Sequence, residues 1–145
     1  MLWRIVLVGW MIVGAPASAA ADVLVVCPHR LRAAIGPWES YRREQGHSLA
    51  VIEPPATAAG LHAAIRNAAR HRELKYVVLV GDVGDVPTDY VDARINLRWG
   101  SEATIATDQT YADVDGDGLP DVAVWRLPAG TPGEPAGGVP QGVGD

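Results

Sequence analysis

The chain has 145 residues, a length that corresponds to one domain. With 48% hydrophobic and 20% charged residues, its composition excludes wholesale disorder, a coiled coil and a collagen-like fibre. The net charge of −5 offers no basic surface for nucleic acid and no block of Lys and Arg for an anionic membrane. The single cysteine, Cys27, excludes an intrachain disulfide framework and a multi-cysteine metal site.

The first residues predict export. Arg4 precedes an uncharged, mostly apolar run at residues 5–15, and the small residues Ala17 and Ala19 follow it. This order is typical of a secretory signal peptide that ends at a small-residue cleavage site. The run is well short of the roughly 20 residues that a spanning helix needs, which favours a cleaved signal over a membrane anchor. We therefore predict a signal peptide over residues 1–21, a secreted or extracytoplasmic product, and no stable membrane insertion.

The next segments alternate between strand and helix patterns. Residues 23–27 (VLVVC), 48–52 (SLAVI) and 76–80 (YVVLV) are short apolar, β-branched runs typical of buried parallel strands. A helix is predicted between the first two strands, started or kinked by Pro37 and ended by Gly46. A second helix, capped by Thr57, precedes the third strand. The pattern predicts an α/β fold, a three-layer parallel sheet with a βαβαβ opening.

The pattern changes after Gly81. Turn residues dominate there, with a possible strand at residues 94–97 and a last strand at 122–125. Beyond Leu127, nine of the final seventeen residues are Gly or Pro, so this segment has no apolar face to bury. The sequence therefore predicts one α/β subdomain over residues 22–128 and a disordered tail over residues 129–145.

An acidic motif, DVDGDGLPD, is the strongest local signal for a metal. Alternating carboxylates with intervening glycines let several oxygens converge on a hard cation such as calcium. The motif is not a complete EF-hand loop, because position twelve is Val124 where such a loop has Glu. The alternative is an acidic hairpin turn without an ion. The surrounding residues 82–121 carry ten acidic and two basic residues, a repulsion that favours calcium. The predicted ligands are Asp113, Asp115, Asp117 and Asp121.

Two further positions are candidate sites. Gly81 and Asp82 follow the third strand, at the edge where open parallel sheets bind ligands, but Gly-Asp is also common turn chemistry, which we favour. Cys27 and His29 are spaced so that contact is possible, yet a lone cysteine in an apolar strand is more often a buried hydrophobe. The sequence contains no glycine-rich phosphate loop. No catalytic or cofactor-binding residue is therefore assigned.

Two segments resemble the amino-terminal half of gingipain-type cysteine peptidases: YVVLVGDVGDVPT at residues 76–88 and TDQTYADVDGDGLPDVAVWRLPA at residues 107–129. The resemblance implies a caspase-like α/β subdomain that lies beside a second one. It also implies a catalytic His, followed by Gly, and a Cys on strands that come later in the chain. This sequence has no His-Gly pair and its only cysteine precedes both motifs, so neither catalytic position is carried over. Trp125 stands where the family usually has glycine.

Three functional hypotheses follow. The first is the amino-terminal part of a secreted gingipain-type cysteine endopeptidase, stabilised by calcium and inactive alone because it lacks the His/Cys dyad. Its partner would be a missing carboxyl-terminal catalytic subdomain, and the complete enzyme would act on protein substrates. The alternative is a secreted, calcium-dependent, non-catalytic binding module. A small-ligand site at the strand ends is a third, weaker hypothesis.

Overall fold

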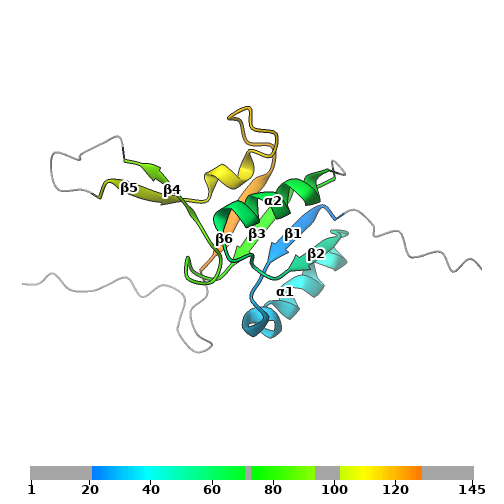
Figure 1. Ribbon diagram of the computed structural model, residues 1–145. Coiled ribbons are helices and arrows are strands. Elements are labelled where there is room, and N and C mark those ends of the chain that lie inside the picture. Colours follow the sequence, from blue (N-terminus) through cyan, green and yellow to red (C-terminus); the bar gives the residue numbers. More distant parts are fainter. Residues whose placement is uncertain (1–20, 71–72, 94–101, 129–145) are drawn as a thin grey trace, which may run out of the picture.

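A parallel sheet forms the centre of the protein. The computed structural model describes residues 21–70, 73–93 and 102–128 (Figure 1). Its main sheet contains β1 (Val23–Val26), β2 (Leu49–Ile52), β3 (Tyr76–Val80) and β6 (Ala123–Leu127), in the order β2-β1-β3-β6. All three neighbouring pairs are parallel. The predicted α/β fold with a βαβαβ opening is confirmed.

The first connection is a short 3₁₀ turn, η1 (His29–Leu31), followed by α1 (Arg32–Glu44). Gly46 ends the helix as predicted, because its φ of 90° is the left-handed conformation that glycine adopts readily. Pro37 lies inside α1 and does not start it. Pro37 has no backbone N–H to donate to the Ala33 carbonyl one turn earlier. Both residues are exposed, so water can hydrogen-bond to that carbonyl instead.

The second connection is α2 (Ala58–Ala69), which begins at the predicted cap. The Thr57 hydroxyl oxygen accepts a hydrogen bond of 3.1 Å from the Gly60 backbone N–H. Leu61 and Ile65, one turn apart, are the buried residues of this helix. The helix therefore packs on the sheet through the face that carries Leu61 and Ile65.

The two helices cover opposite faces of the sheet, so the core has two halves (Figure 1). Side chains alternate along each strand and therefore divide between the two halves. The α2 side contains Leu24, Val26, Leu61, Ile65, Leu74, Val77, Leu79, Val86, Tyr111 and Val122. The α1 side contains Val23, Val25, Cys27, Leu31, Ile35, Val78 and Val80. These layers are the three predicted from the sequence.

The segment between β3 and β6 contains structure that the sequence did not predict. An antiparallel pair, β4 (Asp89–Asp92) and β5 (Thr104–Thr107), projects from the body of the domain (Figure 1). A second 3₁₀ turn, η3 (Gln109–Ala112), packs Tyr111 under α2. Neither β4 (DYVD) nor β5 (TIAT) contains a buried residue, so neither shows the apolar pattern from which a strand is predicted.

Three sequence predictions fall outside the described residues: the signal peptide but for Ala21, the strand at 94–97, and the tail at 129–145. The last strand runs two residues further than predicted, from Ala123 to Leu127. Among the described residues, no helix combines the length and apolarity that crossing a bilayer requires.

One arginine ties β6 to the long connection before it. The Arg126 guanidinium donates to both carboxylate oxygens of Asp108, at 2.7 and 2.8 Å. It also donates to the backbone carbonyls of Gly81, Val86 and Pro87, at 3.2, 3.0 and 3.3 Å. Arg126 therefore joins three chain segments: the strand itself, the loop after β3, and the residue that precedes η3.

Removing the Arg126 guanidinium should destabilise the folded domain. Arg126→Met should lower the free energy of unfolding by about 3 kcal/mol, because it removes the charged partner of Asp108 and the donor to the Gly81 and Val86 carbonyls in a poorly hydrated site. Chemical denaturation measures the change. Arg43→Met is the matched control, since the Arg43 guanidinium is about half exposed and its pair with Glu39, one helical turn away, is worth about a few tenths of a kcal/mol. Equal effects of the two substitutions would contradict the proposed role of Arg126.

The stability that the Asp108–Arg126 contact provides depends on pH. Burial raises the pKa of Asp108, but the hydrogen bonds from Arg126 and Thr88 outweigh this and hold that pKa below its usual value. In the unfolded chain the pKa of this carboxyl is near 3.9, which is above its pKa in the folded chain. The stabilisation that the charged carboxylate provides is therefore complete above about pH 3.9, and it is lost as the pH falls through the folded pKa. The difference in stability between wild type and Arg126→Met should therefore shrink below about pH 4. A difference independent of pH from 7 to 3 would argue against it.

Candidate functional site: an acidic loop and the carboxyl edge of the sheet

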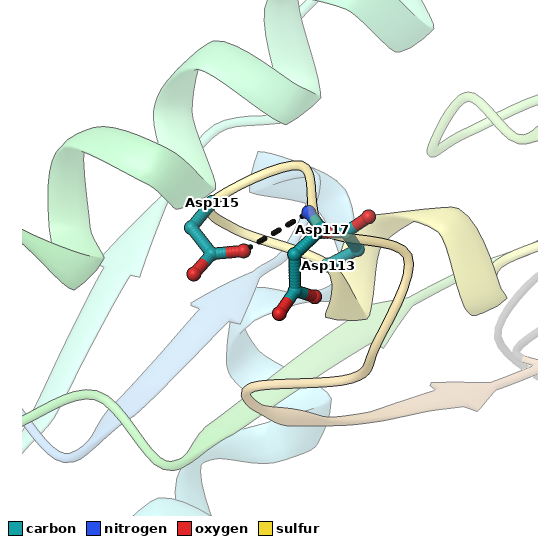
Figure 2. A group of neighbouring side chains, drawn as sticks. All are labelled: Asp113, Asp115 and Asp117. Carbon is teal, nitrogen blue, oxygen red and sulfur yellow. Dashed lines mark hydrogen bonds between the residues drawn. The ribbon is translucent and has the colours of Figure 1, made fainter.

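The acidic motif forms a compact loop between η3 and β6, at the amino-terminal end of that strand (Figure 2). Asp113, Asp115 and Asp117 each place a carboxylate oxygen so that the three atoms lie within 4.8 Å of one another. Asp113 is half-buried, and the other two are exposed. Three of the four predicted ligands are thus brought together by the fold.

Backbone N–H groups of the loop bind the same carboxylates. Asp113 accepts hydrogen bonds from Gly116 and Gly118, at 2.6 and 2.9 Å. Asp115 accepts from the Asp117 N–H at 3.1 Å, the bond drawn in Figure 2. The two glycines have φ values of 87° and 86°, which favour glycine over any residue with a side chain. The turn is therefore specified by sequence, and it orients the carboxylates whether or not an ion is present.

The fourth predicted ligand, Asp121, lies outside this group of three. Its carboxylate accepts a hydrogen bond of 2.9 Å from the Val114 N–H, and its own N–H donates to the Ala112 carbonyl at 2.8 Å. Asp121 thus closes the base of the loop. Val124, at position twelve, lies in β6 and packs against the core, so it supplies no ligand.

The donor set fits a hard cation. Calcium binds oxygen ligands at about 2.3–2.6 Å, so two ligands on opposite sides of one ion can be about 4.6–5.2 Å apart. Oxygens within 4.8 Å of one another meet that limit. Arg66 of α2 and Arg70, which follows that helix, line a hollow of about 470 Å³ together with Asp115 and Asp121. This neighbouring positive charge offsets part of the carboxylate repulsion, which weakens the repulsion argument for an ion.

At the opposite, carboxyl edge of the sheet, Gly81 and Asp82 form a tight turn. Gly81 has a φ of 118°, and a Cβ there would lie 2.7 Å from the Cβ of Asp85, so only glycine fits. The Asp82 carbonyl accepts from the N–H groups of Asp85 and Val86, at 2.9 and 3.0 Å. Arg30 pairs with Asp85, and this hydrogen bond holds the pKa of the Asp85 carboxyl below its usual value. These contacts are the turn chemistry favoured from the sequence.

Cys27 also ends a strand at this edge, but its side chain is fully buried. Burial raises the pKa of the thiol, and the sulfur's hydrogen-bond partner among the described residues is the Pro28 carbonyl oxygen, at 3.5 Å. The His29 N–H donates to Glu53. A protonated, buried thiol without an imidazole partner is not a nucleophile, so the structural interpretation of Cys27 is favoured.

The sequence of the chain matches one known protein family. The model of peptidase family C25 matches residues 16–136. The chain belongs to peptidase family C25, the gingipain family. This match confirms the resemblance carried by residues 76–88 and 107–129. No curated protein matches the chain.

Two solved structures share the fold of this C25 chain. One is the complex of the pro- and mature domains of Porphyromonas gingivalis RgpB, at 22% identity and a TM-score of 0.59. The other is described as the structure of a protease, at 23% identity and a TM-score of 0.62. They cover 74% and 79% of this chain, but it spans only 25% of the length of each. At this identity the likeness establishes the fold alone.

The sequence missed a polar cluster beneath α2 of this C25 chain. His62 lies on α2, and its ring Nε2 lies 2.7 Å from the Asp89 carboxylate. The same Asp89 oxygen accepts from the Thr110 hydroxyl at 2.6 Å, and the His62 ring lies 4.6 Å from that of Tyr111. The cluster fastens α2 to β4 and η3. No periodicity signals it, because the partners are 27 and 21 residues apart.

Proposed function

We propose that this chain is the amino-terminal part of a secreted gingipain-type cysteine endopeptidase. The family match over residues 16–136 is the observation that carries the proposal. The two structural neighbours, each about four times as long as the part matched, support a longer enzyme. The catalytic His and Cys belong, on this proposal, to a carboxyl-terminal subdomain, because the sequence holds neither a His-Gly pair nor a cysteine after the motifs. The complete enzyme would act on protein substrates.

The first test is peptidase activity. The purified 145-residue chain should not cleave peptide or protein substrates, with or without reducing agent, because acyl-enzyme chemistry needs a thiolate and an imidazole that the chain does not bring together. Genomic DNA read past codon 145 should encode a His-Gly and a downstream Cys within about 100–150 residues.

The control is Cys27→Ala. Thiol-dependent turnover by the chain that disappears in this variant would make Cys27 the nucleophile and overturn the proposal. A non-catalytic calcium-binding module, the alternative hypothesis, would show neither turnover nor the two encoded residues.

We further propose that calcium binds the acidic loop and stabilises the fold. Asp113, Asp115 and Asp117 would supply the ligands, with Asp121 closing the loop beneath them. The loop precedes β6, whereas Gly81 and Cys27 lie at the other end of the strands. Five residues of strand separate the two ends, roughly 16 Å. The loop joins η3 to β6, so an ion bound there would tie these two elements together and stabilise the fold.

Calcium titration tests this role. A ligand that binds only the folded state adds about 2.7 kcal/mol at a hundredfold excess over its Kd. For a domain of this size the melting temperature should then rise by several degrees. Extracellular calcium sites bind in the range of about 10⁻⁴ to 10⁻³ M, so the titration must extend well past millimolar.

The decisive variant is Asp115→Asn with Asp117→Asn, which removes two charges but keeps an oxygen to accept each loop hydrogen bond. It should abolish the calcium shift. Asp92→Asn on β4, outside the loop, should leave the shift unchanged. If the melting temperature does not move at high millimolar calcium, or moves equally in the double variant, the loop is only an acidic turn.

Export is the third element of the proposal, supported by the apolar run at residues 5–15 and the small residues that follow it. Secreted material should have lost roughly its first 19–21 residues, as intact-mass measurement would show. Recovery of the full-length chain from the membrane fraction would instead mean that residues 5–15 anchor the protein.

A further inference from the structure

The sheet is covered unevenly on its α1 side. The buried cluster on that side draws residues from β1 and β3 but none from β6. Trp125 and Leu127 of β6 point to the same side, because they alternate with Arg126, and they are 53% and 41% exposed. Parallel sheets occur almost only with both faces covered. An exposed Trp and Leu on one strand of such a sheet therefore mark a surface that another element covers.

The exposed face is aromatic and hollowed. The rings of Tyr76 and Trp125 stack at 5.6 Å with an interplanar angle of 26°. Trp38 of α1 lies across from them, with the Arg42 guanidinium 5.7 Å from its ring. Together with neighbouring residues they line a hollow of about 220 Å³. Its walls can receive an apolar side chain from a packing element.

The outer edge of β6 is open as well. Among the described residues, β6 pairs only with β3. The Ala123 N–H donates to Lys75, and the Leu127 carbonyl accepts from Gly81, so these residues face β3. Alternation then directs the N–H and C=O of Val124 and Arg126 outward. Natural edge strands are commonly protected by charge, proline or a bulge. The one charged side chain of β6, Arg126, points inward, but the Asp108 carboxylate neutralises it, so no unpaired charge of β6 guards this edge.

We propose that β6 is the surface on which the rest of the C25 peptidase packs. A strand of that polypeptide would pair along Val124 and Arg126, and its apolar side chains would cover Trp125 and Leu127. This inference rests on the proposed function, which places further polypeptide after β6. Polypeptide that leaves from Leu127 is tethered at this edge, so its effective concentration there exceeds that of any separate partner. The tether favours this occupant over a second copy of the chain.

Hydrogen exchange distinguishes a covered edge from an open one. The exchange rates of the Val124 and Arg126 backbone amides are measured in the 145-residue chain and in the complete gene product. In the complete protein these amides should exchange roughly a hundredfold more slowly or better, because strand pairing removes them from water. The Ala123 amide, already bonded to β3, should be protected in both and serves as the internal reference.

A substitution tests the side chains. Trp125→Lys should lower the melting temperature of the complete protein by several degrees more than that of the 145-residue chain, in which the side chain is half exposed. Ile105→Lys is the control, because Ile105 is 55% exposed on β5, away from this surface. It should affect both proteins equally.

The outcomes separate this inference from the proposed function. A complete protein that cleaves peptides while its Val124 and Arg126 amides exchange as in the short chain would overturn the inference alone. Protection in the short chain that grows with protein concentration would assign the edge to a second copy, and would also overturn it. DNA that encodes no His-Gly and Cys after codon 145 would overturn the proposed function, and the inference with it.

Discussion

The contact between Arg126 and Asp108 holds the second half of the domain in place. The hydrophobic layers explain why β1, β2, β3 and the two helices assemble, but the connection from Gly81 to β6 is long and mostly polar. A single guanidinium satisfies a carboxylate and three carbonyls of that connection. Because those groups are poorly exposed to water, each would cost free energy if left unbonded. This contact holds the loop after β3 and the residue that precedes η3 against β6.

The two ends of the strands have different chemistry. At the carboxyl edge, Gly81 and Asp85 build a rigid turn, and Cys27 is buried as a small apolar residue. At the amino end of β6, three carboxylates converge in a loop whose glycines and backbone N–H groups fix their positions. These convergent oxygens lie at the end of β6 that is remote from the carboxyl edge.

Uneven cover of the sheet links the fold to the C25 assignment. On the α2 side, Leu61, Ile65 and Tyr111 bury the strands from β1 to β6. On the α1 side, burial stops at β3, and Trp125 remains exposed next to Tyr76. An edge strand without protective charge, next to an uncovered aromatic face, resembles half of an interface more than it resembles a finished surface. The chain spans a quarter of the length of its structural neighbours, which agrees with that view.

The sequence by itself determined the elements with local causes. Apolar β-branched runs predicted β1, β2 and β3, Thr57 predicted the start of α2, and Gly46 the end of α1, since propensity, capping and positive φ act over a few residues. The motifs around Gly81 and Asp113 also indicated the family that the comparison confirmed. Spacing in DVDGDG predicted that Asp113, Asp115 and Asp117 would converge, because alternate residues of a tight turn lie close together in space.

Only the tertiary structure decided the contacts between distant residues. Asp121 closes the base of the loop, where its carboxylate accepts from the Val114 N–H, and it does not join the group of three carboxylates. His62 meets Asp89 across 27 residues, and Arg126 meets Gly81 across 45, and no local pattern encodes such pairs. The hairpin of β4 and β5 was missed because Asp and Thr strands pair through backbone groups that every residue carries. Which side chains lie exposed on β6 depends on what packs against the sheet, a property of the assembled fold.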